Sequence, residues 1–257
     1  MATQLDYQLA VQQVREKLES ILVRAWGSLG SYRDADIDRL VRAVVPHVQA
    51  GQVAVARLTA VYFRNAGYHA GIDAEWVMSG RGVPVDDVYR RPATTVYTAL
   101  SEGKSLDDAI AAGGTRLVSL AMTDLQMAKV RQAQRSLQGA GVDAFRRVLT
   151  GKENCALCVI ASTQRYHSKD LLPIHPGCDC SVDTLPKGFD PSQQVIDPDL
   201  LELTHRAVES KTGQSDRGAR TPDYRQLIMT REHGEYGPTL TWRADKFTSK
   251  ADIPELD

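Results

Sequence analysis

The chain has 257 residues, enough for one large domain or two modest ones. Hydrophobic residues make up 42% and charged residues 25%, and 31 basic against 32 acidic side chains leave a net charge of -1. These values exclude a disordered chain, a collagen-like fibre and a membrane protein, and they argue against a domain whose whole surface binds nucleic acid. All four cysteines lie between Cys155 and Cys180.

The N-terminal stretch 1–17 is polar and has the pattern of a helix, without the apolar segment of a signal peptide. The sequence also lacks a run of about 18 apolar residues that could cross a bilayer. We therefore expect a protein without a membrane anchor in a reducing, cytoplasm-like compartment. Clustered cysteines in such a compartment bind metal more often than they form disulfides.

Hydrophobic residues recur at helical spacing through residues 1–138, which predicts a helical N-terminal domain. The first apolar stripe is predicted to end near Gly27. It consists of Tyr7, Val11, Val14, Leu18, Ile21 and Ala25. A second helix is predicted to start near Asp36. Pro46 predicts a kink or break in it, because proline lacks the N–H for an interior hydrogen bond.

The remaining helices of this domain are predicted from glycine, proline and capping residues. Residues 65–84 contain four glycines and are predicted to form a loop. Pro92 fits the first turn of a helix that reaches about Leu100. Ser105 is predicted to cap a short helix that stops at Gly113 and Gly114, after which a long helix runs to residue 138.

The pattern changes after Gly141. Residues 144–149 are predicted to form a strand, and residues 171–185 two short strands around a His-Pro-Gly turn. Residues 191–257 are predicted to be a linker and extension with a hairpin near its end. The expected fold class is therefore α+β: a helical domain (1–138), a small zinc-stapled α+β domain (139–190) and an extended C-terminal region (191–257).

The cysteines and one histidine have the spacing of a metal site, C-x2-C followed by H-x2-C-x-C. The candidate ligands are Cys155, Cys158, His175, Cys178 and Cys180. Thiolates favour Zn²⁺, and a structural zinc site takes four protein ligands. We expect Cys155, Cys158 and Cys180 to bind zinc, with His175 and Cys178 as alternatives for the fourth position. Two disulfides, or a C-x-x-C redox pair, are the competing interpretations.

Two stretches, FRRVLTGKENCALC (145–158) and LPIHPGCDC (172–180), resemble the minor head protein domain of tailed bacteriophages typified by the F protein of phage Mu. This resemblance covers about forty residues. The segment REHGEYGP (231–238) is similar to the long-helix version of this MuF-like family in phages of actinobacteria. Asp179 stands where family members usually carry arginine, which argues against a shared phosphate contact there and leaves the metal ligands intact.

The resemblance implies a structural minor capsid protein that acts in head morphogenesis. Such a protein is assembled in the host cytoplasm and lies in the virion, inside the capsid near the portal, where it assists head assembly or DNA delivery. Its helical domain is expected to dock on the portal protein or other head proteins, and weak contact with packaged DNA is compatible with this location.

Two alternatives remain open. Family members are often labelled capsid maturation proteases, which cleave scaffold or capsid precursors. The sequence has no G-x-S-x-G elbow and no H-E-x-x-H motif, so it predicts no catalytic residue and favours a structural role over an enzyme. The other alternative is a zinc-stapled DNA-binding protein, in which Arg146, Arg147, Lys152 and Arg165 would contact phosphates.

Overall fold

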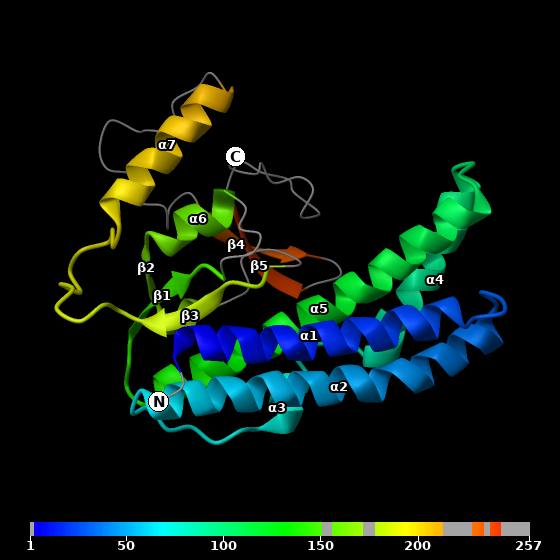
Figure 1. Ribbon diagram of the computed structural model, residues 1–257, viewed down its shortest axis with the longest axis horizontal. Coiled ribbons are helices and arrows are strands. Elements are labelled where there is room, and N and C mark those ends of the chain that lie inside the picture. Colours follow the sequence, from blue (N-terminus) through cyan, green and yellow to red (C-terminus); the bar gives the residue numbers. More distant parts are fainter. Residues whose placement is uncertain (1–2, 151–155, 172–177, 213–227, 234–236, 243–257) are drawn as a thin grey trace.

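The computed structural model describes residues 3–150, 156–171, 178–212, 228–233 and 237–242. This part of the chain is mainly helical and contains a small three-stranded antiparallel sheet, which confirms the expected α+β class. Three long helices lie side by side as an elongated bundle, and the sheet lies beside one end of it (Figure 1). Cys155, His175 and most of the predicted linker fall outside the described residues.

The bundle consists of α1 (Gln4–Gly27), α2 (Asp34–Asn65) and α5 (Leu106–Gly139), with α4 (Val85–Ser101) packed on α2 and α5. The short helix α3 (Ala74–Met78) lies within the segment that was predicted to be a loop. Thr3 and Ser105 cap α1 and α5 by accepting hydrogen bonds from backbone N–H groups in the first turn. Within the described residues, no helix is both long and apolar enough to cross a membrane.

The predicted first helix is confirmed, but its buried stripe turns slightly along its length. Ile21 and Ala25 are only half-buried, whereas Leu22 and Trp26 are buried in the bundle core. A helix repeats every 3.6 residues, so a strict alternation of three and four residues drifts away from the core-facing side.

Pro46 does not break its helix, so that prediction was wrong. α2 runs without interruption from Asp34 to Asn65 and contains Pro46 in its interior. Pro46 itself is exposed, while Val44, Val45 and Val48 around it are buried. Packing of these valines holds the turn in helical form, and water can satisfy the carbonyl that proline leaves without a partner.

The predicted boundaries at Pro92 and at Gly113–Gly114 were also wrong. Pro92 lies in the interior of α4, which begins at Val85, and α5 continues through both glycines. The two glycines allow the indole of Trp26 to approach α5 closely. A Cβ atom at Gly113 would lie only 2.5 Å from Trp26 Cζ2. These glycines therefore serve helix packing instead of helix termination.

Strand β1 (Ala144–Val148) is the centre of the sheet and pairs antiparallel with β2 (Arg165–His167) and β3 (Ser181–Thr184). The prediction of β1 is confirmed. β3 lies in the segment where two strands were expected, but the third strand of the sheet, β2, precedes that segment. Helix α6 (Ala156–Ser162) and a 3₁₀ turn (Ser168–Asp170) lie on either side of β2 along the chain.

The sheet shares its hydrophobic core with one end of the bundle. Phe63, Val130 and Leu137 of the long helices join Phe145 and Leu157 in one buried cluster. Three strands of five, three and four residues are too short to enclose a core alone. The α+β part therefore depends on α2 and α5 for its packing.

The C-terminal region contains a helix that was not predicted, α7 (Pro198–Thr212), which packs on α6. Leu201, Thr204 and His205 recur at helical spacing and are buried. Strands β4 (Ile228–His233) and β5 (Gly237–Trp242) pair antiparallel, which confirms the predicted hairpin.

Candidate metal centre

Three of the predicted ligands come together in the described structure. Cys158 lies in α6, and Cys178 and Cys180 lie just before β3; all three side chains are buried. The Sγ atoms of Cys158 and Cys178 are 3.7 Å apart, and those of Cys178 and Cys180 are 3.1 Å apart. The fold thus joins the C-x2-C helix to the later C-x-C segment across 20 residues of chain.

These distances can be compared with a tetrahedral zinc site. A Zn–S bond of about 2.3 Å places two thiolates on one ion roughly 3.8 Å apart. The pair Cys158–Cys178 has this separation, whereas Cys178 and Cys180 would have to move apart by several tenths of an ångström. The donor set therefore fits zinc chemically and needs a small adjustment in geometry.

The described residues do not form a complete site. Among them, no group of three or more His, Cys, Asp or Glu side chains is arranged to hold a metal ion. Cys155 and His175, the other two predicted ligands, lie outside the described residues. Of the five predicted ligands, the described structure therefore contains three, and all three are buried thiols.

A buried arginine faces these thiols. The Arg147 side chain is 1% exposed, and its Nη1 donates to Cys180 Sγ at 3.6 Å. The guanidinium carbon also lies 5.8 Å from the ring centroid of Phe145 and 5.4 Å from that of Tyr166. A buried guanidinium is stable when it is paired, and the sulfur with two aromatic faces supplies that pairing.

The sequence contained a signal for the burial of Arg147. Residues two apart on a strand point to the same face, so Arg147 shares the face of Phe145, which is fully buried. This alternation argues against Arg147 as a phosphate contact. Of the other proposed contacts, Arg146 forms an ion pair with Asp183 at 3.3 Å, and Arg165 Nε donates to the carbonyl of Gln193. These contacts weaken the DNA-binding alternative.

Two side chains of α5 attach the C-x-C segment to the bundle. Lys129 Nζ donates to the carbonyl oxygen of Asp179 at 2.5 Å, and Gln126 Nε2 donates to that of Cys180 at 3.0 Å. Both side chains are buried. Their burial was not predicted from the sequence, because a polar residue in a long helix is usually solvated. Their place within a run of buried positions from Leu120 to Val130 is visible only once the helices are packed.

The electrostatics favour a thiolate at Cys180. Hydrogen bonds from Cys158 and Cys178 lower the pKa of Cys180 well below its usual value, and the charges of Arg147 and Lys129 act in the same direction against burial. Burial lowers the pKa of Lys129 to about 8, although the nearby Cys180 opposes that shift. The site therefore contains positive charge that stabilises anionic sulfur.

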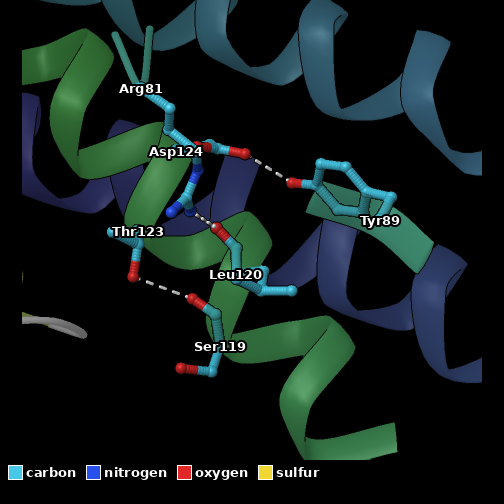
Figure 2. Close-up of polar contacts among 6 residues, drawn as sticks. All are labelled: Arg81, Tyr89, Ser119, Leu120, Thr123 and Asp124. Atoms are coloured by element: carbon cyan, nitrogen blue, oxygen red, sulfur yellow. Dashed lines mark hydrogen bonds and ion pairs between the residues drawn. The ribbon is translucent and has the colours of Figure 1, made fainter. Parts of the chain in front are cut away.

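A second buried polar cluster lies elsewhere on α5 (Figure 2). Arg81 Nε and Tyr89 Oη both donate to the Asp124 carboxylate at 2.6 Å, and Arg81 Nη2 donates to the Leu120 carbonyl at 2.9 Å. Burial raises the pKa of Asp124, while Arg81 and Tyr89 oppose the shift. Each charged group has a partner, so this cluster anchors the segment before α4 to α5.

The geometry therefore places a cluster of buried thiols, with positive charge around it, at the junction of the bundle and the sheet. Comparison of this chain with family models, with curated proteins and with solved structures gives no match.

Proposed function

We propose that this chain is a structural minor head protein whose cysteine window is stapled by Zn²⁺ and whose helical bundle docks on the portal or another head protein. The observation that carries the zinc assignment is the convergence of three buried cysteine thiols from α6 and the segment before β3. Cys158, Cys178 and Cys180 would supply three thiolates, and Cys155 or His175 would supply the fourth ligand. Bound zinc would supply cross-linking, with no open position for catalysis.

A metal staple is physically reasonable in this part of the chain. The sheet has only short strands, and the cysteines that the structure describes lie in α6 and just before β3. Because the unfolded chain has no preformed site, the free energy of zinc binding also stabilises the fold. The staple would hold α6 against the segment before β3, in addition to the hydrophobic cluster that both share.

The surrounding charges support the same assignment. Three or four thiolates around one Zn²⁺ leave a net negative charge in a buried place, which is costly without compensation. Arg147 and Lys129 place two positive charges beside Cys180. Such outer residues orient metal ligands and tune their affinity.

The zinc assignment can be tested by metal analysis of protein purified under reducing conditions. We expect about one zinc per chain, and Cys180→Ser should lower this value toward zero. Val159→Ala is the matched control, because Val159 is buried in α6 beside Cys158 but carries no ligand atom. Metal-free wild-type protein after exposure to Zn²⁺, or full zinc content in Cys180→Ser, would contradict the assignment.

The docking role is supported by the shape and surface of the bundle. α5 has 34 residues and is therefore about 51 Å long. The end of the bundle where α4 turns into α5 lies opposite the sheet (Figure 1). Tyr97, Leu100 and Leu106 are exposed large hydrophobic side chains near this turn. We call this end of the bundle the tip. Its exposed apolar side chains are suited to contact with a protein partner.

Docking can be tested with a purified portal protein of the phage that this proposal implies. Sedimentation of the mixture should show a complex, and Leu106→Asp should weaken it at least tenfold. Leu203→Asp is the matched control, because Leu203 is an equally exposed leucine on α7. Equal binding by the Leu106→Asp and wild-type proteins would exclude this tip as the docking face, and the absence of a complex with wild type would contradict the proposed partner.

A further inference from the structure

A cavity of about 120 Å³ lies between the first turns of α1 and the segment that carries Asp179. Its lining combines two kinds of side chain. Arg15, Lys129, Asp179 and Ser181 are polar, and Leu5 and Leu9 of α1 are apolar and largely exposed, so they stand at the edge of the cavity. A ligand that fits this lining needs both a polar and an apolar part.

The charges that line the cavity add up to a positive value. Arg15 and Lys129 each contribute one positive charge, and Asp179 contributes one negative charge, which leaves +1. Lys129 uses one of its three donors on the Asp179 carbonyl oxygen. The Asp179 carboxylate is already engaged, because its Oδ1 accepts a hydrogen bond from Thr150 at 3.1 Å. The remaining donors of Arg15 and Lys129 match the acceptor oxygens of a monoanion.

The volume limits the size of the ligand. A protein cavity of about 150 Å³ binds benzene, which has six heavy atoms. A cavity of about 120 Å³ therefore holds roughly five or six heavy atoms, which corresponds to a carboxylate with two or three methylene or methyl groups. The apolar walls formed by Leu5 and Leu9 suit such a short aliphatic chain better than they suit a fully hydrated dianion.

We propose that this cavity binds a short aliphatic monocarboxylate, with the carboxylate on Arg15 and Lys129 and the aliphatic chain against Leu5 and Leu9. The same chemistry is found in a free short-chain acid and in the side chain of a glutamate residue. The proposal does not depend on the identity of the protein as a head component. No predicted metal ligand lines the cavity, but Lys129 also lies beside Cys180, so binding is measured on protein of known zinc content.

The test measures the binding of three probes of similar size to the full chain by calorimetry and saturation-transfer NMR. Butyrate should bind with a Kd of about 1 mM, and 1-butanol and inorganic phosphate should each bind at least ten times more weakly. Equal binding of 1-butanol would show an apolar cavity without anion recognition. Tighter binding of phosphate would show a polar anion site. Either result, or no binding of butyrate, would overturn the proposal. A glutamate residue with both its amino and carboxyl termini blocked distinguishes a free short-chain acid from a glutamate side chain. It should bind more tightly than butyrate only if the ligand is a glutamate residue.

Variants of α1 connect binding to the named side chains. Arg15→Gln should weaken butyrate binding at least tenfold, whereas Arg24→Gln should leave it unchanged, because Arg24 is exposed on the same helix and does not line the cavity. Leu9→Ser should weaken the binding of butyrate but not of acetate, which is too short to reach the apolar wall. Far-UV circular dichroism verifies that each variant is folded. Wild-type affinity of Arg15→Gln for butyrate would refute the proposal.

Discussion

The contact between Gly113 and Trp26 allows a quantitative prediction. Gly113 is buried near the N-terminal end of α5, where Trp26 of α1 and Val96 of α4 both approach it. A Cβ atom at this position would lie 2.5 Å from Trp26 Cζ2 and 2.6 Å from Val96 Cγ2. Carbon atoms in contact normally lie about 3.5 to 4.0 Å apart. Gly113→Ala would therefore require a movement of about 1 Å on two sides of the new methyl group.

Two opposing effects determine the magnitude. Alanine is favoured over glycine in a helix by about 1 kcal/mol, while overpacking of a core costs about 1 to 3 kcal/mol. Trp26 cannot move freely, because its Nε1 donates to the Ile110 carbonyl at 3.0 Å and loss of that bond costs about 1 kcal/mol more. We expect a net loss of about 1 to 3 kcal/mol in the free energy of unfolding, and a fall in Tm of roughly 3 to 10 °C.

Urea unfolding followed by circular dichroism measures this loss, and Gly27→Ala serves as the control. Gly27 is the last residue of α1, and no atom lies within 4 Å of a Cβ built there. Its backbone is not left-handed, so alanine should leave stability unchanged or raise it by less than about 1 kcal/mol. A smaller ring in Trp26→Phe should reduce the cost of Gly113→Ala, which gives a favourable coupling in the double-mutant cycle.

Wild-type stability of Gly113→Ala would contradict a close contact at this position. In that case the helix propensity of alanine would outweigh the contact, and the two glycines would have no packing role. A loss of stability that Trp26→Phe does not reduce would show that the strain lies elsewhere, on Val96 or in the helix backbone.

Three further predictions concern buried polar groups. Asp124→Asn leaves Arg81 without its counter-charge and should lower the free energy of unfolding by about 3 kcal/mol; an unchanged urea midpoint would show that the ion pair contributes nothing. Burial raises the folded-state pKa of Asp124 above 3.8, so the folded state retains a proton that the unfolded chain has lost. Stability from this group should therefore fall as pH rises from about 4 to the folded-state pKa, and the difference between wild type and Asp124→Asn should change in that window and stay constant above it. Gln126→Leu leaves the Cys180 carbonyl without its donor and should cost about 1 to 2 kcal/mol, with faster hydrogen exchange in β3 and unchanged exchange in α1; uniform acceleration in both would contradict a local role.

Apolar periodicity predicted the elements whose buried side chains follow the regular period of a helix or strand. The first helix, the strand at residues 144–148 and the C-terminal hairpin were recognisable, because their side chains alternate or recur with the period of the element. Glycine and proline were less reliable. Pro46, Pro92 and Gly113 all lie inside helices, where neighbouring buried side chains keep the backbone helical in spite of the local preference.

The candidate site was predicted in part. The cysteine spacing marked the window, since thiols at such intervals can reach one ion, and three of the five candidate ligands lie in the described structure as buried side chains. Arg147, Lys129 and Gln126 were not recognised as neighbours of these cysteines. They come from β1 and α5, and the residues that they contact lie between 33 and 54 positions away in the sequence. No local pattern links such distant positions.

The sequence by itself thus determined the class of fold, the position of the cysteine window and the kind of ion its thiols prefer, because these follow from local periodicity and from side-chain chemistry. Only the tertiary structure decided that α5 is one helix, that the sheet shares its core with the bundle, and that buried cations of α5 and β1 surround the thiols. Those features depend on which surfaces meet. A buried charge or a close helix contact is stable only when its partner, distant in the chain, is brought beside it.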